Sequence, residues 1–180
     1  WIEFCSSVVF VCLYSFKEMK KVILMRHAKS SWETGLNDKE RPLNSRGKKD
    51  APCMGNKIAE KAIIPDLVIS STSARTKETL SLMPTQIQQN VQFIDDLYLA
   101  SSDEIFETLR ATDNIYNTVL ILAHNPGISC AFYDLARVNI DNVPTSGVGC
   151  ITFNVSSFSE IKKQSGFLDY FMYPKMFSSS

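Results

Sequence analysis

The chain contains two histidines, His27 and His124, and each directly follows a short apolar run, VILMR and VLILA. Apolar runs of this length, rich in Val and Ile, predict buried strands. In open α/β sheets, ligands bind just beyond the carboxyl ends of the strands. A single histidine at such a place would more simply be a buried structural residue, but two at equivalent strand ends indicate a common functional site.

Arginines accompany both histidines at this predicted edge. Arg26 immediately precedes His27, and Arg75 lies where the loop after the apolar run at 67–70 enters a predicted helix. A guanidinium fork matches phosphate oxygens bidentately, so two arginines beside two imidazoles predict a pocket for a dianion, although either arginine alone would be a surface charge. Asn125 then leads toward a helix whose first amides could add donors for the same anion.

A neutral imidazole among positive groups is a good nucleophile toward a phosphoryl group. We expect His27 to be this nucleophile, with Arg26, Arg75 and His124 stabilising charge on the equatorial phosphoryl oxygens. Zinc is the alternative use of paired histidines. A closed zinc site needs three or four ligands, and the arginines beside these histidines would repel the cation. We therefore expect neither a metal nor another cofactor.

The elements that position these residues follow from alternating strand and helix patterns. Strands are predicted at residues 21–25, 67–70, 92–94 and 119–123, with further strand character in the tail at 150–155 and 167–172. Helices are predicted from a cap at Asn44 to about residue 61, and over residues 74–82, 101–110 and 127–136. This alternation predicts an α/β fold, a three-layer α/β/α sandwich around a mostly parallel sheet. The tail is expected to add one or two less regular strands at one edge.

The N-terminal segment is expected to lie outside this fold. Residues 4–16 form an apolar run too short to span a bilayer, and the basic region of a signal peptide is missing. Met19, followed by two lysines, resembles a natural start. We therefore divide the chain into an extension at 1–18, either a misassigned start or a weak membrane anchor, and a single domain at 19–180.

Composition narrows the functional classes. The 19 Lys and Arg residues balance the 19 Asp and Glu residues, so the charge gives no argument for binding nucleic acid or an anionic membrane. The five cysteines include no C-x-x-C pair and are typical of a reduced, intracellular protein. We expect a cytoplasmic protein and make no prediction of its oligomeric state.

Several motifs in order carry a family resemblance: LMRHAKSSW (24–32), DKERPLNSRG (38–47), SSTSARTKET (70–79), LYLASSDEI (97–105) and AHNPG (123–127). From about residue 20 to 174 the chain resembles the histidine phosphatase superfamily, and within it the SixA-type phosphohistidine phosphatases. The resemblance implies a phosphoglycerate-mutase-like fold and a transient phosphohistidine at His27. It also implies a phosphate clamp formed by Arg26 and Arg75, with His124 as the second pocket histidine.

The general acid of this family is harder to place. Related phosphatases and mutases carry a carboxylate just before the segment that corresponds to LYLAS, so Asp96 is the candidate acid here, with Asp95 and Glu104 as others. A solvated acidic turn is the alternative reading for each of them. A P–N bond breaks readily once its nitrogen is protonated, so a SixA-type enzyme has less need of a strong acid.

The chain differs from the usual superfamily sequence at two positions beside the histidines, and two charged residues nearby have alternative roles. Ala28 and Ala123 stand where the superfamily usually has glycine beside its histidines, and we expect a slightly narrower pocket. Asp38 and Arg41 either fix the 38–47 segment over the site or form a purely structural ion pair.

The sequence thus predicts a metal-independent phosphatase that acts through a phosphohistidine intermediate. Its expected substrate is phosphohistidine in proteins, so its partner is a phosphorylated protein or a small phosphorylated compound. The first alternative is a phosphatase of small phosphoesters. The second is a non-catalytic module that binds phosphorylated proteins.

Overall fold

The computed structural model describes residues 19–32 and 35–177, so the predicted extension at 1–18 lies outside the described residues. Its strands are β1 (Lys20–Arg26), β2 (Leu67–Ser71), β3 (Val91–Ile94), β4 (Thr118–Ala123), β5 (Val148–Phe153) and β6 (Phe167–Met172). Its α-helices are α1 (Ser45–Glu60), α2 (Ala74–Ser81), α3 (Ser102–Arg110) and α4 (Gly127–Ala136). Short 3₁₀ turns are η1 (Asp38–Glu40), η2 (Thr85–Ile87), η3 (Asp95–Leu97), η4 (Phe158–Glu160) and η5 (Pro174–Met176).

The six strands form one sheet in the order β3-β2-β4-β1-β5-β6. The first four strands of this order run parallel, whereas β5 pairs with β1, and β6 with β5, in the antiparallel sense. This confirms the mostly parallel sheet. The tail does form the two strands at one edge, and a register shift between Cys150 and Ile151 makes that pairing irregular.

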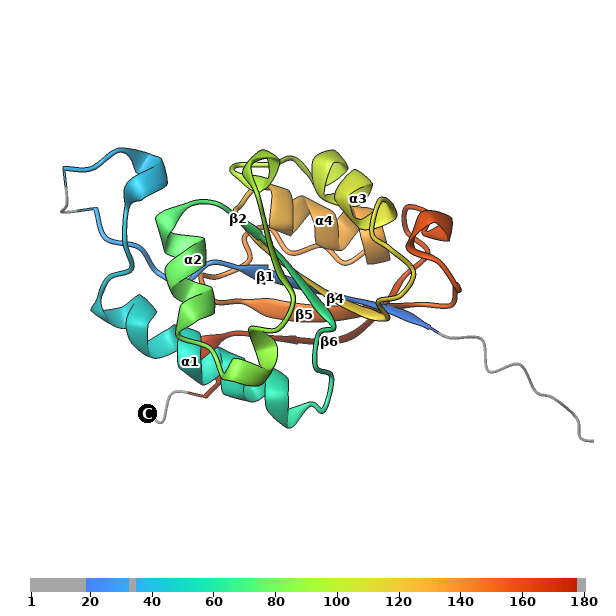
Figure 1. Ribbon diagram of the computed structural model, residues 1–180, viewed down its shortest axis with the longest axis horizontal. Coiled ribbons are helices and arrows are strands. Elements are labelled where there is room, and N and C mark those ends of the chain that lie inside the picture. The colour runs from blue at the N-terminus through green and yellow to red at the C-terminus, as the bar shows by residue number, and fades with distance from the viewer. Residues whose placement is uncertain (1–18, 33–34, 178–180) are drawn as a thin grey trace, which may run out of the picture.

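Helices cover both faces of the sheet, which confirms the three-layer sandwich (Figure 1). The side chains of β1 alternate between the two layers, because successive strand residues point to opposite faces. Ile23 packs with Met54 and Ile58 of α1 on one side. Leu24 belongs to the cluster that holds Phe132 of α4 on the other. The pattern needs a strand that is apolar on both faces, which is why the KVILM run is recognisable in the sequence.

The pairing register between β1 and β4 aligns the ends of the two strands that the histidines follow. The β1–β4 pairing sets Arg26 opposite Ala123, so His27 and His124 leave neighbouring parallel strands at the same level. The backbone N–H of His27 donates to the carbonyl of Ala123 at 3.1 Å, which continues the pairing past the strand end. The predicted convergence of the two histidines is thus built into the sheet.

Side-chain caps fix where the helices beside this edge begin. Asn44 accepts a hydrogen bond from the N–H of Gly47 at 2.9 Å, so α1 starts where the sequence predicts. Ser73 caps α2 and thereby places Arg75 in the first turn of that helix. Ser101 and Glu104 form the predicted capping box at the start of α3. Within residues 19–32 and 35–177, none of the helices has the length and apolarity needed to cross a membrane.

Candidate active site

His27 lies just beyond the end of β1, with 7% of its surface exposed. Its Nδ1 lies 2.7 Å from the carbonyl oxygen of Ala28. A carbonyl oxygen can only accept, so Nδ1 carries the hydrogen and Nε2 keeps a free lone pair. Burial foremost, with smaller contributions from His124, Arg75 and Arg26, lowers the pKa of His27 to about 3, although the hydrogen bond to Ala28 acts in the opposite direction. The ring is therefore neutral at neutral pH.

His124 lies beside His27, with 5.0 Å between the two ring centroids. It is 2% exposed, and its Nε2 lies 2.9 Å from the hydroxyl of Ser71 at the end of β2. Among the described residues, its buried Nδ1 has no hydrogen-bond partner. Burial first, and the charge of Arg75 second, lower the pKa of His124 to about 3. If the Ser71 hydroxyl donates to Nε2, Nδ1 carries a hydrogen that a phosphoryl oxygen can accept.

Arg75 reaches the same edge from the first turn of α2 and is 3% exposed. Both of its terminal nitrogens contact Asp38: Nη1 donates to the Asp38 carbonyl at 2.5 Å, and Nη2 to Asp38 Oδ2 at 2.9 Å. The same carboxylate accepts from the Tyr98 hydroxyl at 2.6 Å and from Arg41 Nη1 at 2.7 Å. These bonds, that of Tyr98 foremost, lower the pKa of Asp38 to about 2. Asp38 thus both pairs with Arg41 and reaches the pocket arginine.

Arg26 forms the other side of the site. Its Nη1 donates to the Val143 carbonyl at 2.7 Å and to Asn142 Oδ1 at 3.1 Å. The side-chain amide of Asn125 donates to the same two acceptors, at 3.1 and 2.7 Å. In this conformation Asn125 supports the wall that holds Arg26, and its amide donors are directed at the protein. Its predicted contact with substrate stays a prediction.

Two buried nitrogens in this group lack a partner among the described residues, Nε of Arg26 and Nδ1 of His124. A buried polar group left without a hydrogen bond costs roughly 1–3 kcal/mol, so it is rarely retained without a reason. Both nitrogens can donate a hydrogen bond, so each is a candidate donor to an anion. Across the described ranges, no group of three or more His, Cys, Asp or Glu side chains is arranged to hold a metal ion.

The three candidate acids lie in different surroundings. Asp96 is exposed in η3 and makes no hydrogen bond or ion pair with any described residue. Asp95, next to it, pairs with Lys39 at 2.6 Å. Glu104 accepts from the backbone N–H and hydroxyl of Ser101 and so belongs to the α3 cap. Two of the three carboxylates therefore have structural partners, and a catalytic role for Asp96 stays a prediction.

Tyr98 contacts two of the predicted residues, His124 and Asp38, and sequence reasoning missed it. Its ring meets that of His124 edge-on, with 5.5 Å between centroids, while its hydroxyl binds Asp38. Asn142 was missed as well. Both side chains come from irregular segments, where no periodicity indicates their direction. The position of Tyr98 within the LYLASSDEI motif was the one available signal.

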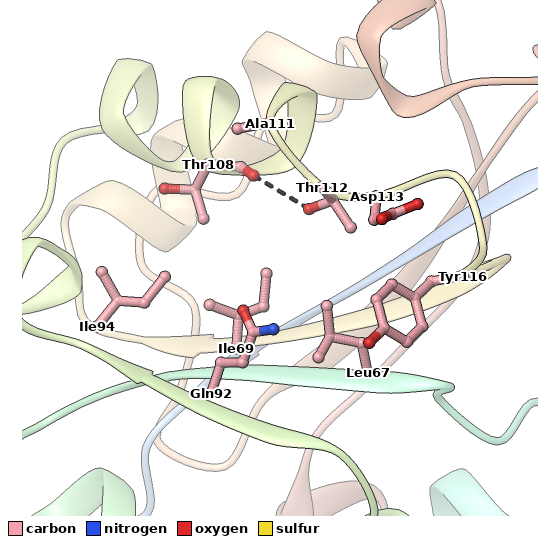
Figure 2. Close-up of a pocket in the computed structure, with 9 residues that line it drawn as sticks. All are labelled: Leu67, Ile69, Gln92, Ile94, Thr108, Ala111, Thr112, Asp113 and Tyr116. Carbon is pink, nitrogen blue, oxygen red and sulfur yellow. Dashed lines mark hydrogen bonds between the residues drawn. The ribbon is translucent and has the colours of Figure 1, made fainter.

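A separate cavity of about 370 Å³ lies between the β2–β3 edge of the sheet and the end of α3 (Figure 2). Leu67, Ile69 and Ile94 line its floor. Its ionisable lining groups are Asp113 and Tyr116, neither of which is cationic. This cavity therefore offers no clamp for an anion.

Known proteins resemble the chain along most of this fold. The sequence model of the histidine phosphatase superfamily (branch 1) matches residues 22–98. An uncharacterized chloroplastic protein of Arabidopsis thaliana is 34% identical over 120 residues, which are 60% of this chain and 55% of that protein. The chain thus spans little more than half of the plant relative. An uncharacterized protein of Mycobacterium leprae is 30% identical over 140 residues, 71% of this chain and 86% of the relative.

Solved structures share most of this fold. A protein from Nakamurella multipartitia, proposed to be a phosphohistidine phosphatase SixA, superposes with a TM-score of 0.77 at 24% identity, covering 87% of this chain and 96% of its own. The protein histidine phosphatase SixA in complex with tungstate gives a TM-score of 0.75 at 20% identity, with 88% and 99% covered. At these identities the likeness establishes the fold.

Proposed function

The chain belongs to the histidine phosphatase superfamily, with the fold of its SixA-type members, and on this premise we propose that it is a metal-independent phosphatase acting through a phosphohistidine at His27. The observation that carries the proposal is the state of the His27 ring. The Nδ1–H is held by the Ala28 carbonyl, and burial keeps the ring neutral, so Nε2 offers a lone pair.

In the proposed first step, Nε2 of His27 attacks phosphorus, and the bond from phosphorus to the leaving group breaks. Arg26, Arg75 and His124 stabilise the charge on the equatorial oxygens, with the unpartnered Arg26 Nε and His124 Nδ1 as donors. In the second step, water attacks phosphorus, the P–N bond to His27 breaks, and inorganic phosphate leaves. His27 returns to its neutral form as water gives up its proton to solvent.

Phosphohistidine in a protein is the substrate we propose. The leaving group is then an imidazole ring, which takes a proton from solvent at its other ring nitrogen before the P–N bond breaks and so departs as a neutral molecule. An alkoxide leaving group depends more strongly on an enzyme acid, and the candidate Asp96 is exposed and unpaired among the described residues. A phosphatase of small phosphoesters is the alternative, and it requires Asp96 or another acid to approach the substrate.

Replacing the nucleophile tests the mechanism. We expect His27→Ala to abolish hydrolysis of a phosphorylated histidine-containing carrier and to remove a phosphoenzyme that is labile in acid and stable in alkali. Rapid quenching with ³²P-labelled carrier measures both. EDTA is expected to leave the wild-type rate unchanged. If the wild-type protein forms no phosphoenzyme and hydrolyses no phosphorylated compound, the protein is a binding module instead.

The leaving-group question has its own test in Asp96→Asn. We expect this variant to keep its kcat/KM on phosphohistidine within about twofold of wild type, because solvent protonates the leaving imidazole at its other ring nitrogen. The comparison is a panel of phosphoesters assayed with both proteins. A strong wild-type preference for esters, lost by about 100-fold in Asp96→Asn, would make the phosphoester reading correct.

A further inference from the structure

A cavity of about 480 Å³ adjoins the active site at Arg26. Its other charged lining residues are Lys29, two residues after the nucleophile, Arg46 in the first turn of α1, and Lys175 in η5. These side chains come from three distant segments of the chain. All four formal charges around this basic cavity are positive, and no carboxylate of residues 19–32 or 35–177 lines it.

Most of this charge is uncompensated. Within the described part of the chain, Lys29 and Lys175 take part in no ion pair or side-chain hydrogen bond. Arg46 has a partner in Asp50 at 3.2 Å, outside the cavity lining. Like charges around one hollow repel each other and raise the local positive potential. In a chain with no net charge, such a concentration of cations favours an anionic ligand at this place.

Arg26 connects the basic cavity to the reacting group. It precedes His27 in the sequence and also lines the cavity, and its guanidinium is held against the wall at Asn142 and Val143. Asn142 itself is part of the cavity lining. A ligand that reaches both His27 and the basic cavity therefore lies next to Arg26.

We propose that the basic cavity binds a second anionic group of the substrate, next to the phosphoryl group that His27 attacks. The inference rests on the proposed phosphatase function and adds a substrate class to it. The shared chemistry is a carboxylate or a phosphate. Its source is an acidic side chain close to the phosphohistidine of a protein, or the second phosphate of a small bisphosphate.

The test compares two charge-removing variants of equal size. Lys29→Gln/Lys175→Gln removes two positive charges from the lining of the cavity. Lys49→Gln/Lys162→Gln removes the charges of two exposed lysines that do not line it. The substrates are a phosphohistidine peptide with glutamates beside the histidine and the same peptide with glutamines. A bisphosphate and the matching monophosphate form the second arm and identify the source of the anion.

We expect wild type and the Lys49/Lys162 control to prefer the member with the second anionic group in at least one pair roughly tenfold in kcat/KM, because each rim charge contributes a few-fold. The cavity variant should lose this preference and keep its kcat/KM on the member without the second anionic group. Equal rates on both members in wild type, or a preference that survives in the cavity variant, would overturn the proposal.

Binding to the His27→Ala protein separates this inference from the proposed function. The Kd of each intact peptide and of each small phosphate is measured by calorimetry, with and without the two cavity substitutions. Tighter binding of the doubly anionic ligand that depends on Lys29 and Lys175 supports the cavity even if wild type hydrolyses nothing, and the phosphatase proposal would then fail alone. Equal Kd values for both members of each pair would show that the cavity is not a second anion site.

Discussion

Arg75 presents both terminal nitrogens to Asp38, so a carboxylate already occupies part of the guanidinium that is expected to clamp a phosphoryl group. The same carboxylate holds Tyr98, whose ring lies edge-on to His124. Asp38 therefore joins Arg75 and Tyr98 through one ionised group. Because charge-assisted bonds of this kind have strict geometry, we interpret Asp38 as the residue that positions the Arg75 fork.

Substitution of Asp38 tests this interpretation. We expect Asp38→Ala to lower kcat/KM about tenfold or more, because Arg75 and Tyr98 lose their common acceptor, while Asp38→Asn, which keeps one acceptor oxygen, recovers most of the activity. Steady-state kinetics and vanadate inhibition of both variants measure the effect. If Asp38 only competes with the substrate dianion, Asp38→Ala would instead bind vanadate more tightly and react faster.

At the scale of elements, close backbone contacts set how the helices approach the active edge. Gly127 begins α4, and a Cβ atom placed on it would lie 2.0 Å from the Ala100 carbonyl oxygen. Ala100 leads directly into the capping box of α3 and lies two residues after Tyr98. The absence of a side chain at Gly127 therefore lets α4 start against the segment that carries a pocket residue.

Gly127→Ala is expected to destabilise the protein by about 1–3 kcal/mol, because a backbone oxygen must move to admit the methyl group. Urea denaturation followed by circular dichroism gives the midpoint shift. Cys130→Ala on the exposed side of the same helix is the matched control and should change the midpoint little. Equal midpoints for the two variants would show that the Ala100 carbonyl can move aside without loss of stability.

Most of the elements were predictable because they follow periodic or local rules. The central strands are apolar on both faces, and the caps at Asn44 and Ser101 carry their own signals. His27, His124 and Arg75 were predicted together because parallel strands deliver their ends to one edge. Tyr98 reaches the site from an irregular segment, and its direction depends on tertiary packing that no local pattern encodes. The hydrogen bond from His27 to Ala28 is equally invisible in the sequence.

For the whole molecule, the two histidines dominate the response to mild acid. Burial lowers both pKa values to about 3, whereas an unfolded chain binds these protons near pH 6.5. The unfolded state therefore binds more protons below pH 6.5. The stability that depends on neutral histidine is fully present above pH 6.5 and is lost as the pH falls from there toward 3.

We expect the free energy of unfolding to fall by about 1.4 kcal/mol per pH unit for each histidine between pH 6 and 5. The chain has no other histidine, so His27→Asn/His124→Asn should remove most of this slope. Urea titrations at pH 7, 6 and 5 measure it in both proteins. An equally steep loss in the double variant would mean that other groups take up the protons.

The alignment of Arg26 with Ala123 also decides where the chain tolerates a change of length. A residue inserted within β1 or β4 would advance the following histidine by roughly 3.3 Å and turn the side chains beyond it to the opposite face of the sheet. The same insertion in the turn between α1 and β2, or between α3 and β4, leaves both strand ends in step. The register between β1 and β4 therefore fixes the relative positions of the two histidines.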